Sequence, residues 1–146
     1  MRKQKGFTLI ELLVVIAIIG LLSTLAVVAL NNARSKSRDA KRVSDIKQIQ
    51  TALELYYNDQ NSYPVVGTAV VLGDTNQKCL DTEGWDVVGC AGATKYMGLV
   101  PSNPLPNGAN YSYTGTASTY SITFNLEGPT GGLLAGSRTA SEAGIK

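Results

Sequence analysis

The side chain whose chemistry is least expected from its position is Glu11, a carboxylate inside a long apolar stretch. That stretch runs from Phe7 to Leu30, and from residue 12 onward it contains no charged side chain. A carboxylate at the centre of a bilayer costs on the order of 3 kcal/mol, so Glu11 needs a partner. Thr8 stands three residues earlier, and this spacing predicts a capping box, in which both side chains bond free N–H groups of the first helical turn. The alternative partner is a cation, for example a new amino terminus formed by cleavage after Gly6.

The apolar stretch at 7–30 is long enough to cross a membrane as a helix. At 1.5 Å per residue it would span about 36 Å, more than the ~30 Å of a hydrocarbon core. A secretory signal has a shorter apolar region, of roughly 7 to 15 residues, so a signal peptide fits poorly. Cations stand on both sides of the stretch, at positions 2–5 and 34–42, and the distribution of positive charge leaves the orientation undecided.

The run from Lys5 to Ile16 reads KGFTLIELLVVI. It resembles the class III leader and N-terminal helix of type IV prepilins and the related type II secretion pseudopilins. The resemblance implies that a prepilin peptidase cuts after Gly6 and methylates the new terminus at Phe7. It also implies that Glu11 pairs with the terminal amine of a neighbouring subunit during assembly, and that the amino terminus starts in the cytoplasm. Val28 stands where many pilus subunits carry a helix-breaking proline.

Residues 31–58 contain neither proline nor glycine, and their apolar residues recur at helical spacing. That stripe consists of Val43, Ile46, Ile49, Leu53 and Tyr56. The pattern predicts one helix from about Phe7 to about Asn58, apolar in its first half and amphipathic in its second. We expect the stripe to pack against a following sheet, with Lys41, Asp45 and Gln48 facing away. The Asn-rich segment before Pro64 ends the helix.

A basic run, unmatched elsewhere in the chain, follows the apolar stretch. Nine cations and four carboxylates precede Asn58, and four cations and seven carboxylates follow it. We expect this run to form a solvated collar beside the membrane. One alternative is contact with the acidic heads of neighbouring subunits, and another is a DNA-binding strip, which is disfavoured because no aromatic residue interleaves with the cations for base stacking. The run comprises Arg34, Lys36, Arg38, Lys41 and Arg42.

After Pro64 the sequence changes to short β-rich runs separated by turn residues. The clearest strand is 120–126, in which apolar and polar residues alternate. Residues 111–113 predict a preceding strand, 115–118 a turn, and the region near Leu133 a third strand. The fold class is therefore α+β, with a long N-terminal helix packed on a small antiparallel sheet of about three strands. We expect a leader at 1–6, a membrane and polymerisation half at 7–30, a stem half at 31–60 and a head at 61–146.

Cys79 and Cys90 flank a loop-like segment, and in an exported head we expect them to form a disulfide; the alternative is two unpaired thiols. Zinc is disfavoured because the chain has no histidine and two cysteines. A calcium site in the acidic loop is disfavoured because its spacing matches no EF-hand pattern. The carboxylates of that loop are Asp74, Asp81, Glu83 and Asp86.

No enzyme site is expected in this chain. The absence of histidine excludes histidine-based acid–base or nucleophilic chemistry. Ser44 and Lys47 match S-x-x-K, but the accompanying S-D-N and K-T-G elements of that enzyme class are absent, so we interpret the match as coincidence. We expect no catalytic residue, cofactor or metal.

The resemblance implies a structural subunit of a type IV pilus, a homopolymer arranged as a helical filament. Its partners would be the prepilin peptidase, an inner-membrane assembly platform and an ATPase motor. The chain would be a single-pass protein of the cytoplasmic membrane before assembly and part of an extracellular filament afterwards. Three alternatives remain: the major pseudopilin of a type II secretion system, a DNA-binding competence pilin, and a single-pass membrane protein that keeps its first six residues.

Overall fold

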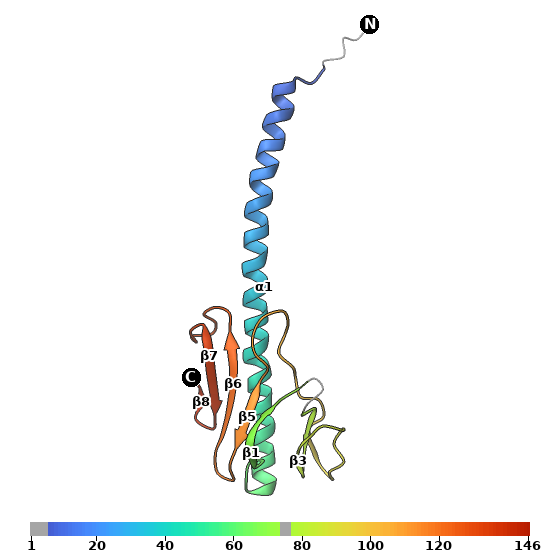
Figure 1. Cartoon of the computed structure of the whole chain (residues 1–146), viewed down its shortest axis with the longest axis vertical. Coiled ribbons are helices and arrows are strands. Elements are labelled where there is room, and N and C mark those ends of the chain that lie inside the picture. Colours follow the sequence, from blue (N-terminus) through green and yellow to red (C-terminus); the bar gives the residue numbers. More distant parts are fainter. Residues whose placement is uncertain (1–5, 74–76) are drawn as a thin grey trace. The chain divides into compact units, whose positions relative to one another are not determined.

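A computed structural model describes residues 6–73 and 77–146 of the chain. One helix, α1 (Leu9–Gln60), is followed by short strands (Figure 1). The described chain divides into two compact units, with the boundary after Ser35. The first unit is the apolar part of α1, and the second unit, 36–146, combines the rest of α1 with the sheets and forms the head. Met1 to Lys5, most of the expected leader, lie outside the described residues.

The predicted long helix is confirmed, with slightly different ends. It begins at Leu9 and ends at Gln60. Asn61 follows in a left-handed conformation, with φ of 53°, which asparagine tolerates better than most residues. Pro64 then prevents a return to helical geometry. Within α1 there is no proline, and Gly20 leaves no break in the helix.

The amphipathic stripe packs against the sheets as expected. Ile46, Ile49, Leu53 and Tyr56 are buried, and they join the core formed by the inner faces of the strands. Burial of an aliphatic side chain of this size contributes about 1.5–3 kcal/mol. The stem half of α1 is therefore one layer of the head, and its stability depends on the sheets beside it.

One expectation for this part of α1 was wrong. Asp45 does not face away from the head: it is 4% exposed and accepts a hydrogen bond of 3.0 Å from the Tyr111 hydroxyl. Its position directly before Ile46 and one turn before Ile49 places it at the border of the buried stripe. Burial, together with the nearby Asp45 carboxylate, raises the pKa of Tyr111, so the phenol stays protonated and keeps donating.

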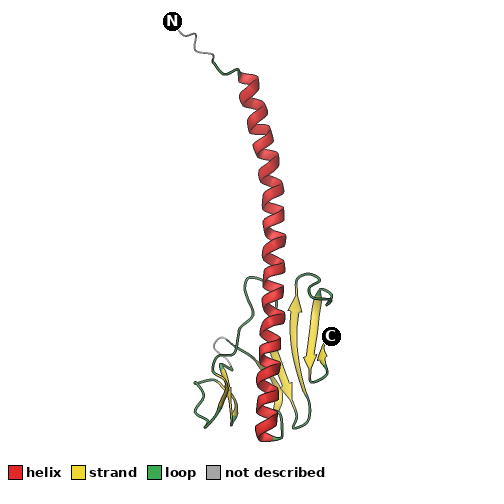
Figure 2. Cartoon of the chain, turned by 180° about the vertical axis from the view of Figure 1, so that it is seen from behind, coloured by secondary structure: helices red, strands yellow, loops and turns green. Residues whose placement is uncertain are grey.

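The main sheet is antiparallel and has the strand order β1-β5-β6-β7-β8. Its strands are β1 (Val66–Val71), β5 (Ser112–Gly115), β6 (Tyr120–Leu126), β7 (Gly136–Ser141) and β8 (Gly144–Ile145). The central strand β6 shows the predicted alternation, because all its inward positions are buried: Tyr120, Ile122, Phe124 and Leu126. A second antiparallel sheet has the order β3-β2-β4, with β2 (Cys79–Asp81), β3 (Gly84–Asp86) and β4 (Lys95–Met97). Within the head, β7 with β8 and the second sheet lie on opposite sides of α1 (Figure 2).

The α+β class is confirmed, but the expected sheet of about three strands was too small, and the strand expected near Leu133 was wrong. Leu133 makes only an isolated bridge to Thr130, and β7 starts at Gly136. Gly131 and Gly132 both have positive φ, of 60° and 85°, and turn the chain there. β7 gave no alternating apolar signal because Ala140 is its one fully buried residue.

Candidate functional site

The capping box at the start of α1 is confirmed by geometry. The Thr8 N–H donates to Glu11 Oε2 at 2.8 Å, and the Thr8 hydroxyl donates to the same oxygen at 2.6 Å. The Glu11 N–H in turn donates to Thr8 Oγ1 at 3.3 Å. Glu11 is thus held against its own helix, and its charge is offset by two hydrogen-bond donors of the first turn. Any intermolecular partner must compete with, or add to, these bonds.

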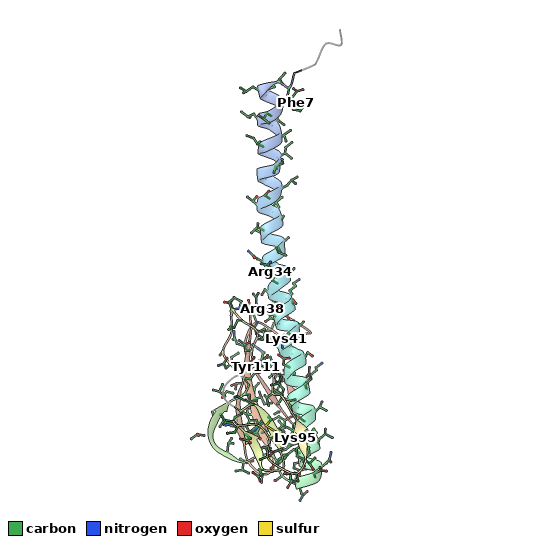
Figure 3. All side chains as sticks on the ribbon, turned by 90° about the vertical axis from the view of Figure 1, so that its right-hand side faces the viewer. Phe7, Arg34, Arg38, Lys41, Lys95 and Tyr111 are labelled. Carbon is green, nitrogen blue, oxygen red and sulfur yellow. A yellow bond between two sulfur atoms is a disulfide. The ribbon has the colours of Figure 1, made fainter. Side chains whose placement is uncertain are left out.

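The rest of the first unit presents an apolar surface without cover. Every leucine, isoleucine and valine from Leu9 to Leu30 is at least 45% exposed. An 18-residue window of α1 reaches a mean hydropathy of 2.9 with none of it buried, so the helix is long and apolar enough to cross a membrane. Gly6 and Phe7 precede α1 and are exposed as well. Figure 3 shows Phe7 next to the start of α1. The residues on both sides of the Gly6–Phe7 bond are therefore exposed.

A second notable site is a buried ionic cluster in the head, centred on Arg42, whose side chain is completely buried. Its Nε donates to Asn103 Oδ1 at 2.7 Å. Its Nη1 donates to Asp39 Oδ1 at 2.6 Å and to Glu127 Oε1 at 2.7 Å. Its Nη2 donates to the carbonyl oxygens of Pro104, at 3.1 Å, and Asn107. One guanidinium thus joins α1 to two loops that are distant in sequence.

Both carboxylates of this cluster, Asp39 and Glu127, accept several hydrogen bonds. Asp39 accepts the backbone N–H of Glu127 at 3.0 Å and that of Gly128 at 2.8 Å. Arg38 forms a bidentate pair with Glu127, with bonds of 2.7 and 2.6 Å. Hydrogen bonds from Arg38, and then from Arg42, hold the pKa of Glu127 well below its usual range. We call Arg38, Asp39, Arg42, Asn103 and Glu127 the arginine cluster.

The arginine cluster corrects the expectation of a solvated collar. Arg42 is buried, and Arg38 is paired with Glu127 and only 20% exposed, so neither cation is freely solvated. Lys41 is half exposed and pairs with Asp45 at 2.8 Å. Figure 3 shows Arg38 and Lys41 following one another along α1. Sequence reasoning missed Asp39 and Glu127 as partners, because their contact spans 88 residues and has no local pattern.

The disulfide between Cys79 and Cys90 is confirmed, with Cα atoms 5.9 Å apart. The segment between them is not a plain loop, since β2 and β3 form a hairpin within it. Asp81 in this hairpin is 1% exposed, and its carboxylate accepts the N–H groups of Glu83 at 2.9 Å and Gly92 at 2.7 Å. Asp74 of the expected acidic loop lies outside the described residues. Within the described residues, no three metal-ligating side chains cluster.

Replacing both cysteines by serine, Cys79→Ser with Cys90→Ser, is expected to destabilise the head by about 3 kcal/mol. The chain-entropy model gives this loss for a loop of this length, because the unfolded chain regains the freedom that the bridge removes. Denaturant unfolding of the purified full chain in detergent measures it. An unchanged midpoint in the double variant, or in the reduced native protein, would show that the bridge contributes no stability.

A membrane-length N-terminal helix whose second half packs on a small antiparallel sheet defines the class of pilin-like proteins. The model of the prokaryotic N-terminal methylation motif matches residues 1–27. The chain is 32% identical to type II secretion system core protein G of Vibrio cholerae over 137 residues, covering 90% of this chain and 87% of that protein. It is 30% identical to the protein of the same name of Pseudomonas aeruginosa over 135 residues, covering 90% and 89%.

A third relative with the same name is more similar in sequence, but over a shorter segment. The protein of Aeromonas hydrophila is 46% identical over 63 residues, which is 43% of this chain and 44% of that protein. No solved structure matches the chain significantly. With two relatives matched over most of their length, the chain belongs to the type II secretion system core protein G family.

Proposed function

We propose that this chain is the main structural subunit of a pseudopilus of the type II secretion kind. The observation that carries the proposal is the similarity to core protein G over nine-tenths of the chain, head included. It favours the pseudopilin interpretation over the type IV pilus subunit that the N-terminal motif alone led us to expect. The role is structural, without a catalytic step by this chain. A DNA-receptor role receives less support, because Arg38 and Arg42 are engaged within the head.

The exposed apolar part of α1 supports the first step, insertion in the membrane. With leucine, isoleucine and valine side chains exposed along 9–30, this segment is stable in lipid or against other helices of its kind. Before assembly, the chain is a single-pass protein of the cytoplasmic membrane. In the filament, the apolar segments of neighbouring copies replace lipid around one another.

The second step of the proposed function is removal of the leader. Cleavage of the Gly6–Phe7 bond creates an amine at Phe7, four residues before Glu11. The peptidase then methylates that amine, which keeps its positive charge. The amine of an incoming copy pairs with Glu11 of a copy already in place, and Thr8 keeps the carboxylate hydrogen-bonded until then. Charge neutralisation removes the cost of holding Glu11 among apolar helices, so it fixes the register of the new copy.

The decisive experiment is the N-terminal mass of the protein from cells, compared between the membrane fraction and filaments sheared from the surface. The proposal expects a methylated Phe7 start, with most of the processed chain in the envelope and few or no long surface filaments. Abundant long filaments would favour the type IV pilus subunit. A chain that begins at Met1 in every fraction would contradict both functions and leave a membrane protein with a capping box.

Gly6→Leu is expected to leave the leader uncut, so that processing falls at least 100-fold. Gly6 has open space around it in the folded chain, so the larger side chain changes the peptidase substrate and nothing else. Gly20→Leu is the matched control, because Gly20 also has open space and lies inside the apolar helix. Equal processing of both variants would contradict cleavage after Gly6.

A further inference from the structure

The part of α1 that belongs to the head has an exposed face opposite the buried stripe. Lys36, Ala40, Lys47 and Thr51 recur along it at helical spacing, and Val43, which is half-buried and packs against the core, lies at its edge. The other cations of this part of α1 are paired, but neither Lys36 nor Lys47 has a carboxylate within ion-pair distance in the described part of the chain. A shallow groove runs along this face, lined by Ala40, Val43, Ser44, Lys47, Gln48 and Thr51. The groove is apolar at one end, where Ala40 and Val43 lie, and the unpaired Lys47 lies at its rim.

The complementary feature is the corner that follows β3 in the disulfide segment. Val88 is 92% exposed, the largest exposed fraction among the large apolar side chains of the described residues, and Val87 beside it is also exposed. The Val88 N–H donates to Asp86 Oδ1 at 2.9 Å, and the Cys79–Cys90 bond closes the segment behind it. Segment 79–90 carries three carboxylates and no cation. The disulfide and this hydrogen bond constrain the segment, so binding costs less ordering entropy than it would for an open loop.

Building on the proposed function, we propose that the corner formed by Asp86, Val87 and Val88 docks in the α1 groove of a second copy of this chain. The two valines would cover Ala40 and Val43, and Asp86 would lie near Lys47. Charge and polarity match: an acidic apolar corner meets a basic apolar groove. Two copies joined in this way would leave a free corner and a free groove. Repeated from copy to copy, such a heterologous contact generates an open helical filament when its rotation does not close into a ring.

The first test places a benzophenone photocrosslinking amino acid at Val88 in the full chain, expressed in cells that assemble it. Irradiation is expected to give a dimer band whose crosslinked peptide maps to residues 36–51 of the second copy. The same amino acid at Leu134 is the matched control, because Leu134 is also exposed but lies in the connection between β6 and β7. Crosslinks from Val88 to lipid, to another protein or to another segment of this chain would overturn the contact.

The second test uses charge. Lys47→Glu and Asp86→Asn are each expected to reduce the Val88 crosslink and the filament yield about fivefold. Asp86→Asn keeps an oxygen to accept the Val88 N–H, so the corner retains its shape. Lys146→Glu, the same reversal as Lys47→Glu at an exposed position that lines neither the groove nor the corner, is expected to change neither quantity. Unchanged crosslinking and yield in Lys47→Glu would overturn the proposal.

These tests separate the docking contact from the function on which it rests. Processed chain in filaments, with Val88 crosslinks elsewhere, contradicts the contact and leaves the pseudopilin function standing. Wild-type chain that keeps its leader and never assembles contradicts the function, and the docking contact is then rejected with it.

Discussion

Glu11→Ala is expected to be cleaved and methylated normally but to reduce filament assembly by about two to three and a half orders of magnitude. In the proposed function the peptidase acts at Gly6 and Phe7, outside the capping box, so processing does not need the carboxylate. Assembly does, because an incoming amine surrounded by apolar helices would find no countercharge. Loss of one partner of a desolvated ion pair costs about 3–5 kcal/mol, which corresponds to that factor. The N-terminal mass and the yield of filament per cell measure the two effects.

Two further variants, Glu11→Gln and Thr8→Val, separate the charge of Glu11 from its hydrogen bonding. Glutamine keeps hydrogen-bonding capacity toward Thr8 and loses the charge, so it should assemble as poorly as alanine. Thr8→Val keeps the charge and loses one hydrogen bond to it, so its defect should be at most about tenfold. A glutamine variant with wild-type filament yield would show that Glu11 acts as a helix cap alone.

Arg42→Met is expected to destabilise the head by about 3–5 kcal/mol, the second large effect. Methionine fills much of the buried volume but leaves Asp39 without its cation and the oxygens of Asn103 and Pro104 without a donor. Uncompensated buried charge, and not the loss of attraction alone, produces a penalty of this size. Chemical unfolding of the full chain in detergent, followed by tryptophan fluorescence from Trp85, gives the change in midpoint.

Two further variants identify the cause. Arg38→Met should cost about 1 kcal/mol, since its pair with Glu127 is partly open to water and Arg42 still neutralises that carboxylate. The double variant Asp39→Asn, Arg42→Met should recover part of the loss of Arg42→Met, because it removes the stranded charge of Asp39 and keeps a side-chain oxygen to accept a backbone N–H of Glu127 or Gly128. If the double variant were no more stable than Arg42→Met alone, the uncompensated charge of Asp39 would not be the cause of the loss.

Much of the N-terminal half could be predicted from local patterns. The capping box depends on residues three apart, the membrane segment on an uninterrupted apolar run, and the stem on a stripe at helical spacing. Each is a short-range signal that the helix itself dictates, and the observed helix, Leu9–Gln60, differs from the predicted one by two residues at each end. Strand β6 was equally predictable, because one of its faces is core and the other is solvent.

The arginine cluster and the extra strands could not be predicted in this way. Arg38 and Arg42 look like ordinary stem cations in the sequence, and their burial depends on Glu127, which a sheet brings back to α1. β7 and β8 are polar or glycine-containing and give little side-chain signal; β7 joins the sheet by pairing with β6, and β8 joins it by pairing with β7. The N-terminal motif resembles that of pilus and pseudopilus subunits alike, so it does not separate the two, whereas the matches to core protein G extend over nine-tenths of the chain.

The arginine cluster also sets an order of events during synthesis. Arg42 leaves the ribosome early, yet its carboxylate partner Glu127 is 85 residues later, and the two amides that bind Asp39 come from Glu127 and Gly128. Until those residues have emerged, the stem half of α1 has a cationic and acidic face with no partner, and a long loop must still be closed. The arginine cluster is therefore expected to close only after Gly128 has emerged, so the head locks in its last folding steps and not stepwise along the chain.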